Sequence, residues 1–141
     1  MATELFVDTS AWFPLAVRGH PDHARVAAAL RQRRAAGARP LTTNLIVAEV
    51  HALLLRRLHR AAALAFLRQV GLADALVVPS TPELELRGRE DWIERYADQD
   101  LSLTDAVSFA LMDERGIREA LTLDRHFAAA GFLMAPARAR G

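Results

Sequence analysis

Residues 4–10 read Glu-Leu-Phe-Val-Asp-Thr-Ser, and this stretch decides the expected fold. An apolar run leads into an aspartate, Asp8, which two hydroxyl residues follow in a turn. This pattern indicates a buried strand with an acid at its carboxyl end. A second strand-like run, Ala120-Leu121-Thr122-Leu123, ends in the same way at Asp124. In parallel sheets functional groups gather at the carboxyl ends of strands, so the two acids are expected to share a site.

Helical patterns separate the short strand-like runs along the rest of the chain. Helices are predicted over 11–15 (halted near Pro14), 23–34, 43–57, 61–70, 82–96 and from 106 to a stop at Gly116. Further strands are predicted at 41–42, 76–78, within 117–123 and at 132–134. Strands that alternate with helices favour an α/β fold with a mostly parallel sheet covered on both faces. One domain over residues 1–135 is expected, with a short basic tail, 136–141, that frays.

Composition excludes several classes of protein. The chain has 141 residues, 52% of them hydrophobic, which fits one compact domain. The absence of cysteine excludes disulfides and thiolate metal sites. All 18 basic residues are arginine, so the lysine of a phosphate-binding P-loop is missing. The sequence shows no signal peptide and no apolar run long enough to cross a membrane, so we expect a cytoplasmic protein.

Two more acids belong with the strand-end pair. Glu49 lies in a helical pattern on the same side as Ile46 and Leu53, and a carboxylate on an apolar face is costly to bury without a partner. Asp105 follows Ser102 by three residues, the spacing of a helix capping box. Each acid also has an ordinary explanation: Asp8, Asp105 and Asp124 as helix caps, and Glu49 as an exposed side chain. Four acids at strand ends and in helical patterns of one chain are much less frequent by chance than any one of them.

The four carboxylates predict a metal site. Carboxylates that converge repel one another unless a positive charge lies between them. A hard divalent cation is the usual occupant of a site built from oxygen ligands. The nearby hydroxyls of Thr9, Ser10 and Thr104 are positioned to hydrogen-bond such ligands. This chemistry is typical of hydrolysis of a phosphate ester.

Other polar residues are assigned structural roles. His20 and His23 flank Pro21-Asp22 in a loop, where cap and turn roles explain them better than a metal site. The pairs Arg33-Arg34 and Arg56-Arg57 are interpreted as solvated helix faces. The formal net charge of +1 gives only a weak overall attraction for nucleic acid, although single arginines can still bind phosphate.

Four segments in order resemble the PIN-domain ribonucleases, and among these the toxins of the VapC type in bacterial toxin–antitoxin pairs. The segments are Leu5 to Ser10, Asn44 to Val50, Leu101 to Ala106 and Leu121 to Phe127. Each motif is weak alone, but their order and spacing extend over nearly the whole chain. The resemblance implies a three-layer α/β/α sandwich with a central, mostly parallel sheet.

The resemblance also implies an endoribonuclease that depends on Mg²⁺ or Mn²⁺. The acidic quartet would be Asp8, Glu49, Asp105 and Asp124, with Asp8 and Asp105 holding the metal and Thr9, Ser10 and Thr104 at its edge. Candidate RNA contacts are Arg18, Arg87, Arg89 and Arg125. Expected partners are the RNA substrate, a small antitoxin and a second copy of the chain in a homodimer. Many relatives have a further acid where this chain has His126.

Three alternatives stay open. A phosphatase or receiver would use Asp8 as phosphate acceptor, but Ser10 stands in place of a second aspartate and the usual lysine is missing. A protein-binding module would keep the fold and use its acids only as caps. An RNA-processing nuclease without an antitoxin would share the chemistry and differ in its biology.

Overall fold

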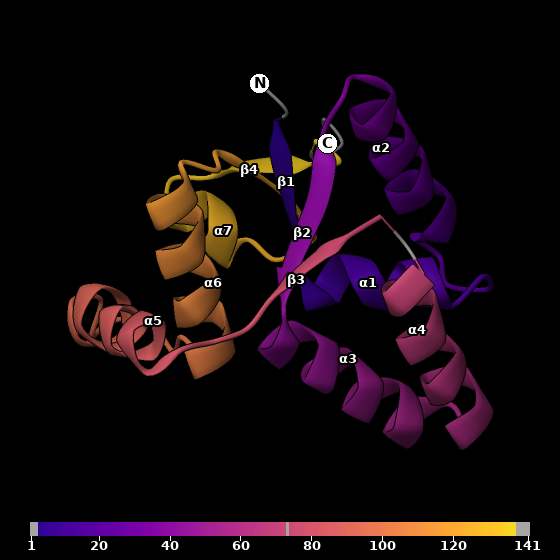
Figure 1. Ribbon diagram of the computed structural model, residues 1–141, viewed down its shortest axis with the longest axis horizontal. Coiled ribbons are helices and arrows are strands. Elements are labelled where there is room, and N and C mark those ends of the chain that lie inside the picture. The colour runs from indigo at the N-terminus through magenta and orange to yellow at the C-terminus, as the bar shows by residue number, and fades with distance from the viewer. Residues whose placement is uncertain (1–2, 73, 138–141) are drawn as a thin grey trace.

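The computed structural model describes residues 3–72 and 74–137, which form a central sheet with helices on both sides (Figure 1). The strands are β1 (Glu4–Val7), β2 (Arg39–Thr43), β3 (Leu76–Val78), β4 (Glu119–Leu121) and β5 (Leu133–Ala135). The strand order is β3-β2-β1-β4-β5, and all four pairings are parallel. The predicted α/β class and parallel sheet are confirmed. Of the expected tail, residues 138–141 lie outside the described range.

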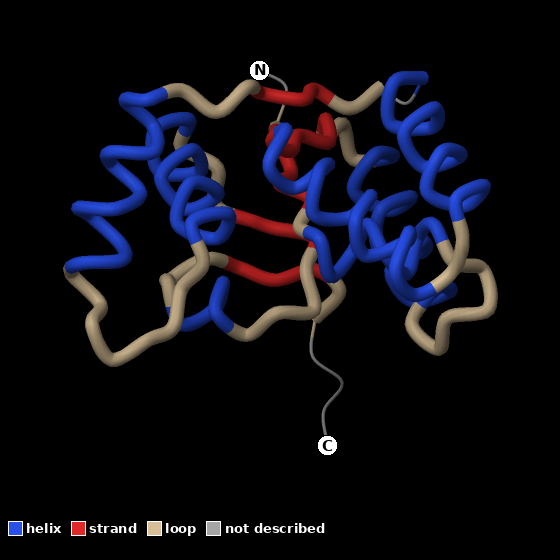
Figure 2. Tube along the Cα trace, turned by 90° about the horizontal axis from the view of Figure 1, so that it is seen from below, coloured by secondary structure: helices blue, strands red, loops and turns tan. Residues whose placement is uncertain are grey.

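Helices form the two outer layers, which are visible from two directions in Figures 1 and 2. One layer consists of α1 (Thr9–Ala16), α2 (His23–Ala35), α3 (Asn44–Arg57) and α4 (Arg60–Leu72). The other contains α5 (Pro82–Arg87), a π-helix η1 (Gly88–Glu94), α6 (Leu103–Arg115) and α7 (His126–Ala129). The three-layer sandwich is therefore as expected. Within the described residues, no helix combines the length and apolarity needed to cross a membrane.

The strand order places β1 beside β4 at the point where the chain reverses its direction across the sheet. From β1 the chain adds β2 and then β3 on one side, and it returns to add β4 and β5 on the other. Crevices at such a switch point are the usual binding sites of open α/β sheets. Asp8 directly follows β1, and its backbone N–H donates to the Leu121 carbonyl at the end of β4 (3.1 Å).

A buried aromatic group fixes α6 and α7 against the sheet. Phe6 of β1, Phe109 of α6 and Phe127 of α7 are fully buried. The Phe127 ring lies 6.1 Å from Phe6 and 4.9 Å from Phe109, centroid to centroid. Every residue of α6 from Ala106 to Met112 is buried, so the helix cannot rotate without exposing apolar surface. Asp105 directly precedes this run, and its position is therefore set by the core.

Three predicted helices differ from the observed ones. The first helix continues through Pro14 to Ala16. In so short a helix the proline removes only the hydrogen bond that would reach the Ser10 carbonyl. The Val17 backbone N–H still donates to the Phe13 carbonyl (3.1 Å). The helix expected over 82–96 changes at Gly88 into the π-helix η1. The observed α6 begins at Leu103, three residues before the predicted start at 106. The remaining boundaries differ by one or two residues, which is the usual uncertainty of helix and strand ends.

Gly88, where the helix changes, packs closely against α6. A Cβ atom at Gly88 would lie 3.1 Å from the Ala106 carbonyl carbon and from the Val107 nitrogen. Leu84, Gly88 and Trp92 are all buried, at intervals of four residues. Residues four positions apart lie on one face of a helix, so this buried series faces α6.

Candidate active site

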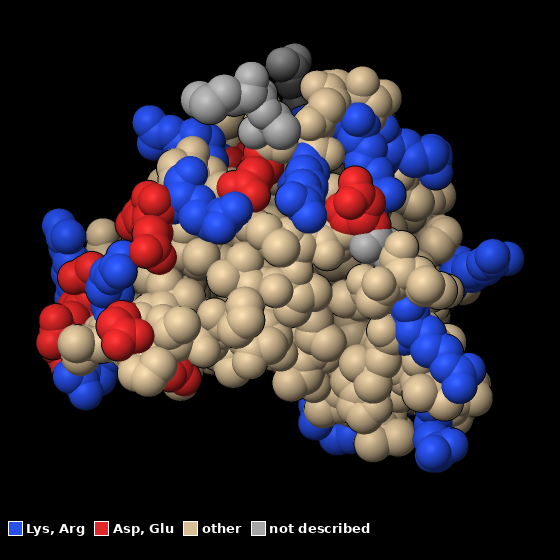
Figure 3. Space-filling view, viewed as in Figure 1, with Lys and Arg blue, Asp and Glu red and all other residues tan. Residues whose placement is uncertain are grey.

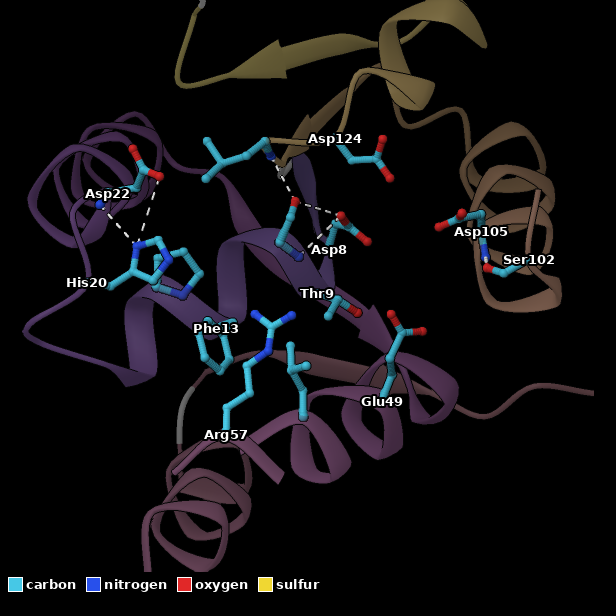
Figure 4. Close-up of a pocket in the computed structure, with 14 residues that line it drawn as sticks. Asp8, Thr9, Phe13, His20, Asp22, Glu49, Arg57, Ser102, Asp105 and Asp124 are labelled. Carbon is cyan, nitrogen blue, oxygen red and sulfur yellow. Dashed lines mark hydrogen bonds and ion pairs between the residues drawn. The ribbon is translucent and has the colours of Figure 1, made fainter. Parts of the chain in front are cut away.

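The acids predicted from the sequence meet in one cavity of about 420 Å³ at the carboxyl edge of the sheet. We call it the acidic cavity (Figure 4). Its walls come from the ends of β1 and β4, from α1, from the loop before α2, and from α3 and the start of α6. The lining residues are Asp8, Thr9, Ser10, Phe13, Pro14, His20, Asp22, Glu49, Leu53, Arg57, Ser102, Asp105, Leu123 and Asp124.

Asp8 is buried and held through one carboxylate oxygen. Its Oδ2 accepts hydrogen bonds from Ser10 Oγ (2.8 Å) and Thr122 Oγ1 (3.1 Å). It also accepts from the Ser10 backbone N–H (3.3 Å), so Asp8 caps α1 as well as lining the cavity. Burial raises the pKa of Asp8, and the hydrogen bonds from Ser10 and Thr122 lower it in part. The two interpretations of Asp8 from the sequence, as a helix cap and as a residue of a shared acidic site, are thus compatible.

The hydroxyls of Ser10 and Thr122 connect the two central strand ends. Ser10 Oγ accepts from the Leu123 backbone N–H (2.8 Å), and Thr122 Oγ1 accepts from the Asp124 backbone N–H (3.0 Å). Each hydroxyl therefore accepts from the chain after β4 and donates to Asp8 after β1. This network holds the backbone of Asp124 in register with Asp8. Ser10 was expected at this place from the sequence, whereas Thr122 was not.

Asp105 shows how strongly the acids influence one another. Ser102 Oγ accepts from the Asp105 backbone N–H (3.1 Å), which confirms Ser102 as the helix cap. The pKa of Asp105 is raised to about 6, first by burial and then by the negative charges of Asp8, Asp124 and Glu49. Carboxylates interact in this way only when they are near one another. A role as a simple helix cap would not account for this convergence.

Asp124 is paired with His126, which stands where the resemblance to the PIN-domain ribonucleases implies a further acid. Asp124 Oδ1 accepts from the His126 backbone N–H and also lies next to its Nδ1 (3.0 Å for each). The possible ligand atoms of Asp105, Asp124 and His126 lie within 4.8 Å of one another, as in a site that can hold a metal ion. His126 thus joins the acidic cluster in space.

Glu49 lines the cavity, but the prediction that it lies on the buried apolar face of its helix was wrong. Its side chain is exposed, and the buried face of α3 is formed by Ile46, Val50 and Leu54. The predicted helix phase failed because nearly every residue around Glu49 is apolar, so periodicity could not identify the buried side. Glu49 instead points into the cavity from the wall opposite Asp124 (Figure 4).

The predicted hydroxyl residues differ in their positions. Thr9 lines the cavity, and its Oγ1 is enclosed without a hydrogen-bond partner in the described part of the chain. A buried hydroxyl in that state is a place for a bound ligand or water. Thr104 is not part of the cavity wall, and its carbonyl accepts from Ser108 Oγ (2.8 Å) within α6. Thr9 therefore lies in the acidic cavity, whereas Thr104 lies outside its wall.

The four arginines proposed to contact RNA lie outside the cavity wall. Arg18 and Arg125 are exposed, and Arg125 follows Asp124 directly. Arg87 is paired with Glu114 near the far end of α6 (3.4 Å), and Arg89 is paired with Glu94 (3.3 Å) and Glu90 (3.7 Å). Figure 3 shows this mixture of arginines and acids over α5 and η1. The glutamates reduce the positive charge that Arg87 and Arg89 offer to RNA.

The structure also adds wall residues that the sequence had assigned elsewhere. His20 and Asp22 lie in the cavity wall, although they were interpreted as loop and cap residues. Asp22 occupies the N-cap position of α2, but its side chain makes no cap hydrogen bond and accepts instead from Arg25 (3.3 Å). Arg57, interpreted as part of a solvated helix face, reaches the cavity with its guanidinium 5.7 Å from the centre of the Phe13 ring. The spacing 49, 53, 57 along α3 was the signal that could have revealed it.

Comparison with known proteins gives consistent results. A family model for the PIN domain matches residues 5–133. The 23S rRNA-specific endonuclease VapC20 of Mycobacterium tuberculosis is 36% identical over 134 residues, which cover 92% of this chain and 95% of that protein. Ribonuclease VapC26 of Mycobacterium tuberculosis is 33% identical over 127 residues, which cover 89% of this chain and 90% of that protein.

Solved structures show the same similarity in three dimensions. The crystal structure of Mycobacterium tuberculosis VapC20, a toxin that cleaves the sarcin–ricin loop, matches with a TM-score of 0.79 and 32% identity over 92% of this chain and 96% of that one. VapBC2 from Rickettsia felis, bound to a DNA fragment from its promoter, matches with a TM-score of 0.67 over 94% of this chain and 97% of that one. At 9% identity, the second match concerns the fold alone.

Proposed function

The chain belongs to the PIN-domain family, and from this membership we propose that it is a metal-dependent endoribonuclease that acts as the toxin of a toxin–antitoxin pair. The observation that carries the proposal is the meeting of Asp8, Glu49, Asp105 and Asp124 in one cavity at the switch point of the sheet. A role as helix caps alone does not require the four acids to lie in one cavity. The phosphatase alternative is not favoured, because Ser10 stands in place of a second aspartate and the chain has no lysine.

The residues of the acidic cavity fit a divalent cation. Asp8, Asp105 and Asp124 supply carboxylate oxygens, and Asp8 keeps Oδ1 clear of the hydrogen bonds that hold Oδ2. The pKa of Asp105 is raised first by burial and then by the negative charges of Asp8, Asp124 and Glu49, and such a cation would offset these charges. The enclosed hydroxyl of Thr9 adds a polar group without a protein partner. We propose Asp8 and Asp105 as ligands of Mg²⁺ or Mn²⁺, with Asp124 and His126 completing the site.

The remaining groups of the cavity would act on water and on the substrate. When bound, the cation lowers the pKa of a bound water molecule and offsets charge on the phosphate oxygens. Glu49, from the opposite wall, would accept the proton of the attacking water as general base. The water oxygen bonds to phosphorus, and the 3′ oxygen leaves and takes up a proton. The products are a 5′-phosphate and a 3′-hydroxyl.

The relatives support RNA as the substrate and an antitoxin as the partner. VapC20 is named as a 23S rRNA-specific endonuclease and as a toxin that cleaves the sarcin–ricin loop. We propose the same loop of ribosomal RNA as the first substrate to test, because the identity extends over nearly the full length of both proteins. A small antitoxin that blocks the acidic cavity and a homodimer complete the proposal.

Cleavage of RNA tests the activity. Purified protein, free of any antitoxin, would be incubated with ribosomal RNA in Mn²⁺, Mg²⁺ or EDTA, beside Asp105→Asn and the control Asp113→Asn, which changes an exposed acid of the same helix. We expect cutting in metal by the parent and by Asp113→Asn, with 5′-phosphate ends, and no cutting by Asp105→Asn. Cleavage that persists in EDTA would contradict the role of the metal. A folded and fully active Asp105→Asn protein would contradict the proposed site.

A further inference from the structure

The acidic cavity has one wall of different character, which is formed by the end of α3. Glu49, Leu53 and Arg57 all line the cavity, and they follow one another at intervals of four residues along one face of the helix. At 1.5 Å per residue, Glu49 and Arg57 are about 12 Å apart along the helix axis. The same helix face therefore presents a carboxylate near the acids and a guanidinium further away.

Arg57 is held with its donors available. Its guanidinium carbon lies 5.7 Å from the centre of the Phe13 ring, within the range of a cation–π contact. Within residues 3–72 and 74–137, no carboxylate lies within 4.0 Å of the Arg57 guanidinium, whereas Arg33, Arg87 and Arg115 each pair with a glutamate. A guanidinium that contacts an aromatic ring keeps N–H groups free for phosphate oxygens.

The charge around the cavity makes this arginine important. Five of the lining residues are acids, and Arg57 is the single arginine among the lining residues of the described chain. An RNA backbone that approaches the acids is repelled except where a positive group meets its phosphates. The chain from Val50 to Leu72 has no acid and four arginines, and Figure 3 shows only arginines among the charged residues over this end of the molecule.

We propose that Arg57 binds the phosphate group of RNA that flanks the bond to be cut, and that the backbone then continues over the basic surface of α3 and α4. This inference rests on the proposed function, since it concerns the same cavity. Arg57 would hold the RNA in register with the acids, about two turns of α3 away from Glu49. Phe13 would position the guanidinium from beneath.

RNA binding tests the proposal through the loss of one phosphate contact. All proteins would carry Asp105→Asn so that the RNA remains intact, and a labelled single-stranded RNA would be titrated by fluorescence anisotropy in Mg²⁺ at several salt concentrations. Replacing Arg57 with Ala should weaken binding by about tenfold to a hundredfold. It should also reduce the slope of log affinity against log salt concentration by about 0.7. A structural role alone would not change the salt slope.

Matched variants separate Arg57 from general positive charge. Arg56→Ala removes the neighbouring exposed arginine, which does not line the cavity, and should weaken binding by no more than about threefold. Arg57→Lys keeps the charge and should restore the salt slope while affinity stays below that of the parent. Equal losses for Arg56→Ala and Arg57→Ala, or an unchanged salt slope, would overturn the proposal.

The binding and cleavage measurements test the inference about Arg57 and the proposed nuclease function separately. Cleavage is measured on proteins that keep Asp105. If the parent protein cuts RNA, but Arg57→Ala cuts as well as the parent and binds as well in the Asp105→Asn background, the inference is wrong and the proposed function stands. If RNA binding depends on Arg57 but the parent does not cut in any metal, the inference stands and the nuclease function is wrong. A parent protein that binds no RNA would overturn both.

Discussion

Thr122 and Asp8 are 114 positions apart in the chain, yet the Thr122 hydroxyl lies 3.1 Å from Asp8 Oδ2 and donates a hydrogen bond to it. The same hydroxyl accepts from the Asp124 backbone N–H (3.0 Å). One buried side chain thus links two of the four acids across the two central strands. Thr122 holds the carboxylate of Asp8 through Oδ2, and Oδ1 is not used in these hydrogen bonds.

Thr122→Val should remove this link while preserving the shape of the buried side chain. We expect the free energy of unfolding to fall by about 1–3 kcal/mol, because Asp8 loses a donor in a buried setting. Metal-dependent cleavage should fall as well, since both Asp8 and Asp124 lose a restraint. Urea unfolding and RNA cleavage measure the two effects.

Thr42→Val is the matched control, because Thr42 is equally buried and donates to the Val7 carbonyl (2.9 Å) and not to a cavity acid. It should lose stability but keep cleavage at a temperature where the protein is folded. Equal cleavage by Thr122→Val and the parent would show that the link to Asp8 has no role in the site.

The metal-free protein should become less stable as pH rises from 3.8 to about 6. Asp105 has a pKa of about 6 in the fold, against 3.8 for an unperturbed aspartate, so the folded state binds more protons than the unfolded state in this range. The free energy of unfolding then falls with rising pH. Asp8, whose pKa is also raised, acts in the same direction.

Chemical denaturation in EDTA across this pH range, for the parent and for Asp105→Asn, isolates the contribution of Asp105. The difference in unfolding free energy between the two proteins should shift in favour of Asp105→Asn as pH rises. Parallel pH profiles for the two proteins would argue against the raised pKa of Asp105. Acids far from the cavity contribute equally to both profiles and cancel in the difference, whereas Asp8, Asp124 and Glu49 interact with Asp105 and do not cancel.

A divalent cation should stabilise the folded protein, because it offsets the repulsion among the clustered carboxylates. At a hundredfold excess of Mn²⁺ or Mg²⁺ over its dissociation constant, the gain in unfolding free energy should be about 2.7 kcal/mol. Thermal melts with metal and with excess EDTA measure it, and Asp105→Asn should gain much less. A parent melting curve that neither ion moves would mean that the acids do not bind metal.

Gly88→Ala should disturb the site from a distance. The new Cβ would lie 3.1 Å from backbone atoms of Ala106 and Val107, so the backbone of η1 or of α6, which carries Asp105, has to shift. Overpacking of this kind destabilises by about 1–3 kcal/mol. We expect a lower melting temperature and weaker metal binding, measured by calorimetry.

Gly71→Ala is the control for Gly88→Ala. Gly71 lies in α4, where a Cβ meets no atom within 4 Å, so the substitution should be neutral or stabilise by up to about 1 kcal/mol. If Gly88→Ala is as stable as Gly71→Ala, the close contact between η1 and α6 does not constrain the fold.

Local pattern in the sequence was sufficient for much of the fold. Apolar runs that end in an acid identified β1 and the approach to Asp124, and Ser102 was confirmed as a cap because capping depends on residues three positions apart. The phase of α3 around Glu49 was wrong, because an almost uniformly apolar segment has no periodic signal. The π-helix that begins at Gly88 was not predicted either.

The sequence by itself determined the class of fold and made Asp8, Asp105 and Asp124 candidates, because strand and helix periodicity and acids at the ends of these elements are local properties of the chain. Only the tertiary structure decided that Thr122 holds Asp8, that His126 joins Asp105 and Asp124, and that Arg57, among 18 arginines, reaches the cavity. These relationships depend on strand order and helix packing, which join residues far apart in the chain. Chemically identical side chains can be distinguished only by where that packing places them.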